Sequence, residues 1–343
     1  MNWGDFMTLK FKNIIFISGL TLLFLILWGI SLLADTPQGY SGLGATTDLS
    51  PDDQVIAFSY YHDGDASLYT VPVTGGRAEL LAEPEEGTSY INPVFSPDGK
   101  NIAFIKQWDE NEEPFGELMM INIENESIDE LTSEGNHVTD AAFAPNGKEL
   151  YLLQSSVYEN YSPIASEHPH GFDIFHLDLK TNQIEQLTNE DAYEMSDIAV
   201  TPDGEQIMYH SYRDDDILAF YSLESEMENA FVPKGADLKE SIISSPALAD
   251  DGERVVFSGV AGEDGNYIYE GFIVDLNTKE AKKVTSFNEH VTSPVFFNHQ
   301  NKLLVTVDEN FAGAEPANGY WIIDLDKEDS RQWVEIKMSE KES

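Results

Sequence analysis

Hydrophobic and polar residues alternate in short runs along nearly the whole chain after residue 48. A period of two is typical of β-strands with one buried face. Six of these runs follow a turn motif of the form apolar-Ser-Pro-Asp-Gly, with spacings of 46, 48, 57, 48 and 48 residues. The six copies begin at Leu49, Phe95, Phe143, Val200, Leu248 and Phe296. A sequence that repeats at this period predicts a ring or stack of similar β-units.

Each repeat predicts four strands. The turn joins the first two, because Pro sets φ, Asp or Asn bonds the backbone and Gly accepts a positive φ. In the second copy, paired apolar residues at 102 and 104 mark the second strand and the run 118–121 marks the third. The fourth strand ends in Leu-Thr or Val-Thr at Thr132, Thr188 and Thr285. Residues 48–337 are therefore predicted to be an all-β, six-bladed β-propeller of four-stranded antiparallel blades.

The repeat resembles that of the TolB-like six-bladed β-propeller family. The resemblance rests on Ser-Pro-Asp-Gly-Lys at 96–100, Ile-Ala-Phe at 102–104 and Leu-Thr at 131–132, and it covers residues 48–337. TolB proteins carry an additional N-terminal domain, and a similar propeller covers the catalytic domain of prolyl-oligopeptidase-like peptidases. We expect neither extra domain in this sequence. The resemblance implies the fold, and fold alone does not decide the function.

One apolar segment precedes the repeats. Residues 14–34 contain no charged side chain and would span about 31 Å as a helix. Lys10 and Lys12 precede the segment and Asp35 follows it, so the positive-inside rule predicts a cytoplasmic head over 1–13 and an extracytoplasmic propeller. A cleaved signal peptide is the alternative and would make the domain secreted, but its apolar region usually runs about 7 to 15 residues. We predict a single-pass transmembrane signal anchor in the cell membrane, a tether over 35–47 and a tail over 338–343.

The composition is strongly acidic. The chain has 62 acidic and 19 basic residues, a net charge of -43, and no cysteine. Phosphate binding needs Lys and Arg, so this charge argues against nucleic acid as a partner. The absence of cysteine excludes disulfides, thiolate metal sites and a cysteine nucleophile. A saline or alkaline habitat and a cation-binding surface both remain explanations of the charge.

The third repeat is longer than the others because of the segment 154–172, which we expect to be a loop. In a propeller, such loops share one rim with the connections between blades, and long loops are often functional. Four of its side chains are candidate partner contacts: Tyr158, Tyr161, His168 and His170. The two histidines with Glu167 could also ligate a metal, but two histidines in one loop are usually solvated. We predict no metal site there.

Polar residues near the start of each first strand are expected to converge on a central channel. They are Asn92, His137, Asp140, Glu194, Asp197, Ser244 and His290. These groups could coordinate a ligand, or they could line a channel that holds only water.

Catalytic signatures are absent from the sequence, which has no Gly-x-Ser-x-Gly elbow, His-Glu-x-x-His motif or phosphate-binding glycine loop. The first hypothesis is therefore a non-enzymatic protein-binding, scaffold or sensor module without a cofactor, whose partner is an envelope protein or peptide. The alternative is a channel-centred, metal-dependent hydrolase or lactonase-like enzyme, since such sites need only dispersed Asp, Glu, Asn and His residues. A third hypothesis is the binding of a cationic peptide or glycan across the acidic rim.

Overall fold

A computed structural model of the chain describes residues 16–24, 39–111, 113–133, 137–160, 167–262, 267–311 and 313–338. The chain divides into two units, residues 1–39 and 40–343. In the first unit residues 16–24 are helical, while residues 14–15 and 25–34 of the predicted anchor and the predicted head lie outside the described residues. Within the described part of the chain, no helix is long and apolar enough to cross a membrane.

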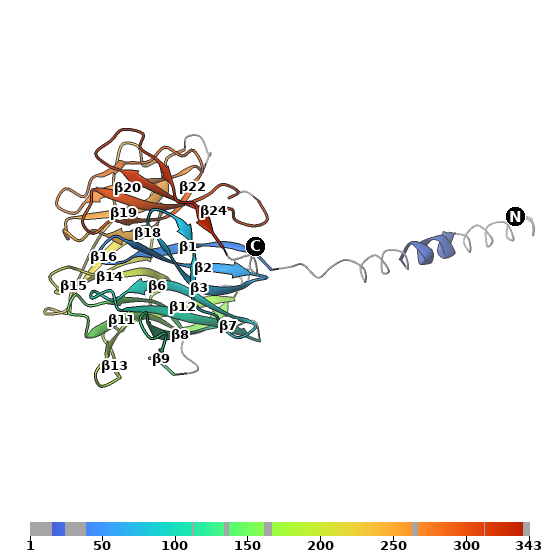
Figure 1. The fold of residues 1–343 in the computed structure, drawn as a ribbon, viewed down its shortest axis with the longest axis horizontal. Helices are drawn as coiled ribbons and strands as arrows, with labels where there is room; N and C mark the ends of the chain where they lie inside the picture. The colour runs from blue at the N-terminus through green and yellow to red at the C-terminus, as the bar shows by residue number, and fades with distance from the viewer. Residues whose placement is uncertain are drawn as a thin grey trace, which may run out of the picture. The chain divides into compact units, whose positions relative to one another are not determined.

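The second unit is built from antiparallel strands that pair in sequence order within each repeat, as the alternating pattern predicts (Figure 1). Repeat one contains β1 (Gly42–Leu49), β2 (Val55–His62), β3 (Asp65–Pro72), β4 (Gly76–Arg77) and β5 (Glu79–Ala82). Repeat two contains β6 (Thr88–Phe95), β7 (Asn101–Glu110), β8 (Glu113–Asn122) and β9 (Ile128–Glu130). Repeat three contains β10 (Val138–Phe143), β11 (Glu149–Asn160), β12 (Glu167–Asp178) and β13 (Gln183–Gln186).

The other three repeats follow the same plan. Repeat four contains β14 (Met195–Val200), β15 (Gln206–Tyr212), β16 (Asp216–Ser222) and β17 (Glu228–Phe231). Repeat five contains β18 (Ile243–Leu248), β19 (Arg254–Val260), β20 (Tyr269–Asp275) and β21 (Ala281–Lys283). Repeat six contains β22 (His290–Phe296), β23 (Lys302–Asp308), β24 (Asn318–Asp324) and β25 (Gln332–Trp333), and β26 (Ile336–Lys337) follows it.

The sheets differ from the prediction in number. Among the described residues, repeats one to four each form a separate four-stranded sheet, whereas repeats five and six share one eight-stranded sheet. The two halves of that sheet are joined by a single parallel pair, Tyr269 with His290. Gly116 and His137 make the same kind of parallel contact between repeats two and three, but there it is an isolated bridge. The larger sheet therefore arises because, in repeats five and six, this one contact joins residues that belong to two strands, β20 and β22.

Two boundaries also differ from the prediction. β1 begins at Gly42, inside the segment predicted as a tether, because Gly42 and Leu43 pair with Tyr61 and Tyr60 of β2. The predicted loop of repeat three is largely strand, because β11 and β12 continue their ladder as far as Asn160 and Glu167. This repeat carries a long projecting hairpin in place of a long loop.

The hydrophobic core lies between neighbouring repeats. The apolar positions of the second and third strands, such as Phe58, Phe104 and Phe257, are fully buried. One cluster joins the first repeat to the last, since Phe58 and Tyr69 pack with Tyr320. β1 and β24 lie side by side in Figure 1, and the Tyr320 hydroxyl donates a hydrogen bond to the Gly44 carbonyl at 2.8 Å. The chain therefore closes into a ring.

The turns form a second ring of contacts. The glycine of each turn packs on the proline of the preceding turn: Gly99 on Pro51, Gly147 on Pro97, Gly204 on Pro145 and Gly252 on Pro202. The first turn has Asp53 at the glycine position and the sixth has Asn298 at the proline position. The Asp53 carboxylate accepts hydrogen bonds from the backbone N–H groups of Asn298 and His299 at 2.7 and 2.9 Å. The two departures from the repeat thus form one pair that closes the ring.

The C-terminal segment adds a further closure. β26 pairs in parallel with β4 of the first repeat, Ile336 opposite Gly76 and Lys337 opposite Arg77. The Gly76 N–H donates to the Glu335 carbonyl at 2.8 Å. The last strand of the chain therefore lies on the first repeat, where its backbone hydrogen bonds resist opening of the ring.

Candidate functional site

All six repeats contribute residues to the wall of a central cavity of about 770 Å³ that extends to the turn prolines. In each repeat one of these residues lies five positions before the turn proline or its equivalent. We call these six residues the channel ring: Thr46, Asn92, Asp140, Asp197, Ser245 and Ser293. Asn92, Asp140 and Asp197 are predicted from the sequence, whereas the sequence prediction places Ser244 in the channel and the structure places its neighbour Ser245 there. Thr46 and Ser293 are not among the predicted residues, although a fixed offset from the turn motif identifies both.

An irregularity of the first strand directs these residues toward the channel. The pairing of the first and second strands shifts register in every repeat, as between Ile91 and Val94 or between Ser196 and Ala199. A β-bulge re-aims side chains by inserting an unpaired residue. Asn92, Asp197 and Ser245 have positive φ values of 51°, 57° and 48°, and Asn and Asp tolerate this region better than most residues. The polar channel ring is thus a consequence of the bulge.

Hydrogen bonds link one half of the channel ring. The Thr46 hydroxyl donates to the Asn92 side-chain oxygen at 3.1 Å, and the Asn92 amide donates to the Thr139 carbonyl at 3.1 Å. The Asp140 carboxylate accepts from the Ile198 N–H at 3.0 Å, next to Asp197. Burial and then the nearby charge of Asp197 raise the pKa of Asp140 to about 7. The channel wall therefore holds carboxyl groups whose negative charge is poorly compensated.

His210 lies behind Asp197 in repeat four, and its side chain is 6% exposed. Its Nε2 is 3.0 Å from the Asp216 carboxylate and its Nδ1 is 3.1 Å from the Ser196 hydroxyl. Burial acts to lower the pKa of His210, but the hydrogen bond to Asp216 and the charge of Asp197 outweigh burial and raise it. The Ser196 hydroxyl donates to Asp197 at 2.5 Å, so His210 does not take its proton as a catalytic base would. This Ser-His-Asp set is structural.

We predict that the free energy of unfolding falls as pH rises from about 5 to 8. Burial raises the pKa of Asp48 and of Asp140 to about 7, so the folded state holds protons that the unfolded carboxyls release near pH 4. His210, whose pKa is also raised, stabilises fully below about pH 6.5 and loses that contribution as pH rises through its folded pKa. Urea unfolding at several pH values measures the slope, with an expected loss of more than about 1 kcal/mol.

Asp140→Asn should reduce this slope, because it removes one of the titrating groups. The matched control is Asp129→Asn, which removes a charge from an exposed strand position. A wild-type stability that rises from pH 5 to 8, or equal slopes in the two variants, would contradict the assignment.

A second group of side chains gathers at the end of the β11–β12 hairpin. The rings of His168 and His170 lie 5.4 Å apart, and the Tyr193 ring from the next repeat lies 5.0 Å from His168. Tyr193 lines a cavity of about 500 Å³ with Tyr212. We call this group the rim cluster: His168, His170, Tyr193 and Tyr212. The remaining residues of the cavity wall are Glu190, Asp191, Ala192, Ser211 and Arg213.

The other candidates from the sequence lie elsewhere or outside the described residues. Tyr158 is in β11, opposite Pro169 of the same hairpin. Tyr161 lies outside the described residues. Within the described part of the chain, no group of three or more His, Asp or Glu side chains is placed to hold a metal ion.

Four predicted channel residues do not line the central cavity. His137 stacks on Phe115, with ring centres 4.6 Å apart, and His290 packs on Phe311 at 3.8 Å. The Glu194 carbonyl accepts a hydrogen bond from the Ser211 hydroxyl, and Ser244 pairs with Ser258 inside the sheet. These residues precede the bulge, so the strand carries them away from the channel ring.

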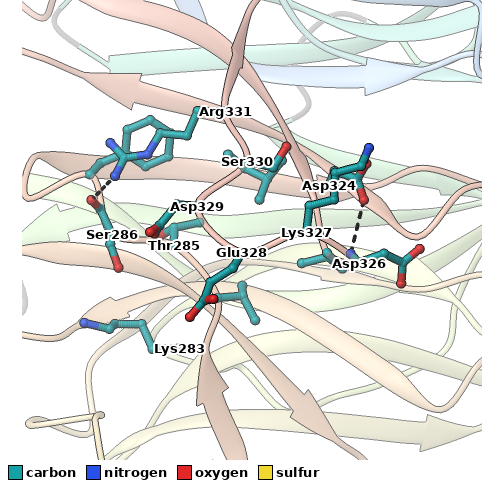
Figure 2. Close-up of a pocket in the computed structure, with 14 residues that line it drawn as sticks. Lys283, Thr285, Ser286, Asp324, Asp326, Lys327, Glu328, Asp329, Ser330 and Arg331 are labelled. Atoms are coloured by element: carbon teal, nitrogen blue, oxygen red, sulfur yellow. Dashed lines mark hydrogen bonds and ion pairs between the residues drawn. The ribbon is translucent and has the colours of Figure 1, made fainter.

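A further cavity of about 400 Å³ lies between repeats five and six (Figure 2). Its lining mixes both signs of charge, with three basic side chains (Lys283, Lys327, Arg331) and four acidic ones (Asp324, Asp326, Glu328, Asp329). Figure 2 shows Lys327 paired with Asp324 and Arg331 bonded to Ser286. The Lys327–Asp324 ion pair is 2.5 Å long, and Arg331 donates to the Ser286 carbonyl at 2.6 Å. Arg331 also lies over the Phe287 ring. Because the numbers of basic and acidic side chains are nearly equal, the lining does not favour a ligand of one sign.

Comparison with solved structures identifies the architecture. TolB from Acinetobacter baumannii superposes with a TM-score of 0.61 and 18% identity, over 83% of this chain and 67% of that chain. The chain has a TolB-like β-propeller fold. An oligogalacturonate lyase in complex with manganese follows the same path with a TM-score of 0.58 and 13% identity, over 85% of this chain and 77% of that chain. The same β-propeller fold occurs in binding proteins and in enzymes, so the fold by itself does not decide the function.

Sequence comparison adds two partial matches. An uncharacterized peptidase, YuxL of Bacillus subtilis, is 28% identical over 134 residues, or 29% of this chain and 20% of that protein. Dipeptidyl-peptidase 5 of Porphyromonas gingivalis is 26% identical over 173 residues, or 48% of this chain and 23% of that protein. The matched region thus spans less than a quarter of the length of these curated relatives. No family model matches the TolB-like chain.

Proposed function

We propose that this chain is a membrane-anchored, extracytoplasmic propeller that binds a protein or peptide of the cell envelope without catalysing a reaction. The observation that carries the proposal is the rim cluster beside its cavity. Tyr193 and Tyr212 are 36% and 43% exposed, and aromatic residues of this kind are enriched in protein interfaces. The long β11–β12 hairpin positions the two histidines of the cluster on ordered strands. A TolB-like fold is consistent with such a partner.

The charged residues in the wall of the rim-cluster cavity indicate the charge of the partner. Glu190 and Asp191 line the same cavity as the two tyrosines. Arg213 is the only Lys or Arg among the described residues of its wall. Arg213 is itself paired with Glu228 at 2.6 Å. In a chain of net charge -43, this wall favours a partner segment with positive charge, which long-range attraction would steer toward the rim.

The anchor is part of the proposal. It is supported by the uncharged segment 14–34 and by the lysines that precede it. We also propose that the ring has six blades. The eight-stranded sheet contains the four strands of repeat five and the four strands of repeat six, and one residue pair joins them.

A metal-dependent hydrolase or lactonase-like enzyme in the channel has less support. The described channel wall contains carboxylates, an amide and hydroxyls, but none of its groups forms a set of three or more His, Asp or Glu ligands. The oligogalacturonate lyase shares the fold at 13% identity, which carries no residue of its site to this chain.

Replacing Tyr193 and His168 with alanine should reduce partner capture at least tenfold, because aromatic anchors at the centre of an interface contribute about 2 kcal/mol or more. The measurement is crosslinking and affinity capture by the full chain from the envelope fraction, with quantitative mass spectrometry. Phe311→Ala is the matched control, since Phe311 is an exposed aromatic residue of repeat six. Equal recovery with the wild type and the double variant would rule out the rim cluster as the binding surface.

A further inference from the structure

We propose that the central cavity is a binding site for a small organic ammonium compound, held by Asp140 and Asp197 and by the serine side of the channel ring. The site lies between the bulges of the first strands and the turn prolines. It is separate from the rim cluster and does not depend on the function proposed for that cluster.

Polar side chains on one side of the channel ring make hydrogen bonds to protein groups, whereas the serines on the other side are available to bond a ligand. On the first side Thr46 donates to Asn92, Asn92 donates to the Thr139 carbonyl, and Asp140 accepts from the Ile198 N–H. Ser293 is 7% exposed and lines the cavity, but its hydroxyl has no hydrogen-bond partner among the described residues. The Ser293 hydroxyl is not enclosed by protein atoms, so it can bond water or a ligand in the cavity. Thr47 Oγ1 in the same wall is a buried atom without a partner among the described residues, a state that costs about 1 to 3 kcal/mol unless water or a ligand satisfies it. The serine side therefore offers free donors and acceptors to a molecule in the cavity.

The charge in the cavity is of one sign. Its described lining includes Asp48, Asp140, Asp197 and Asp250 but no Lys or Arg, and His299 is its only basic residue. Asp140 and Asp197 lie close enough for the charge of one to act on the other. Asp197 lies 4.0 Å from His210, but Asp140 has no cationic partner in the described part of the chain. A cation seated between the two carboxylates would supply that partner, as buried charges normally require.

Size and donor chemistry favour an organic cation over a bare metal ion. The cavity, at about 770 Å³, falls within the range of small-molecule pockets, which is about 300 to 1,000 Å³. An ammonium group donates up to three hydrogen bonds, so it can bridge two carboxylates while a second polar group of the same molecule reaches Ser245 and Ser293. A linear diamine or amino alcohol has this pattern.

The experiment is isothermal titration of the full chain with putrescine, and with a neutral diol of the same length. Salt at about 0.15 M, where the Debye length is about 8 Å, weakens attraction to exposed carboxylates. We expect saturable binding of putrescine at one site and none of the diol. Asp140→Asn and Asp197→Asn should each weaken binding about tenfold or more, because each removes a charge-assisted hydrogen bond.

Asp129→Asn is the control for attraction of putrescine to the overall negative charge of the protein. It removes an exposed charge outside the cavity and should leave the affinity unchanged. Equal affinity in the three variants would overturn the proposal, since putrescine would then bind the acidic surface. Absence of binding by the wild type would overturn it as well. Calcium that binds at one site and excludes putrescine would replace it with a metal site. None of these outcomes bears on partner capture by the rim cluster.

Discussion

Asp53→Gly is expected to destabilise the propeller by about 2 kcal/mol, although it restores the consensus of the turn. Asp53 has a φ of 58°, and glycine at such a position relieves about 1 kcal/mol of backbone strain. The repeat pattern alone would therefore favour glycine. However, Asp53 is 1% exposed and its carboxylate accepts three hydrogen bonds from Asn298 and His299 of the sixth turn. A net contribution of about 3 kcal/mol from this set of hydrogen bonds to a charged group exceeds the gain of about 1 kcal/mol by about 2 kcal/mol.

Urea unfolding of the full chain measures the effect. Asp63→Gly is the matched control, because Asp63 has a φ of 52° and an exposed side chain outside the ring closure. The control should be neutral or slightly stabilising. If Asp53→Gly stabilised the protein as the control does, the pair would have no role in closing the ring.

Glu270→Ala is expected to destabilise the propeller by about 3 to 5 kcal/mol, the largest effect of a single substitution that we predict. Glu270 is 1% exposed at the start of β20 and accepts hydrogen bonds from the Thr285 hydroxyl. It also accepts from the backbone N–H groups of Phe287 and Asn288 at 3.0 and 2.7 Å. Alanine would leave the buried Thr285 hydroxyl and two partly buried N–H donors without an acceptor, and a cavity in place of the side chain.

Chemical unfolding should place Glu270→Gln between the wild type and Glu270→Ala, since glutamine keeps the shape and one acceptor oxygen but loses the charge. Glu185→Ala, at an exposed strand position, should change the stability by no more than about 0.5 kcal/mol. An effect of Glu270→Ala as small as that of Glu185→Ala would show that the hydrogen bonds contribute nothing net.

The Leu-Thr or Val-Thr pair that ends the fourth strand can be recognised in the sequence, but the hydrogen bonds that its threonine makes cannot. In repeats two, three and five the hydroxyls of Thr132, Thr188 and Thr285 accept a hydrogen bond from a backbone N–H of the third strand. Thr188 also donates to Asp173 at 2.7 Å, and Thr285 donates to Glu270. A periodic pattern reveals that the position matters because it recurs. It does not reveal a partner that lies about 14 residues away on a neighbouring strand.

The sequence by itself determined the repeat, the strands and the buried positions. Alternation at a period of two and turns built on Pro, Asp and Gly act over a few residues, so they can be read without coordinates. The confirmed third strands and the fully buried second-strand residues follow from these local rules.

Only the tertiary structure decided which residues meet. Asp53 and Asn298 appeared as unrelated defects of their repeats, and ring closure makes them a pair across 245 residues. Tyr193 joined His168 because the connection to repeat four passes the long hairpin of repeat three. The channel ring depends on a bulge that shifts the register by two residues in repeat one and by one residue in the other repeats, which alternation cannot predict. Contacts between repeats depend on how the sheets are arranged in space, and a pattern confined to one strand carries no information about that arrangement.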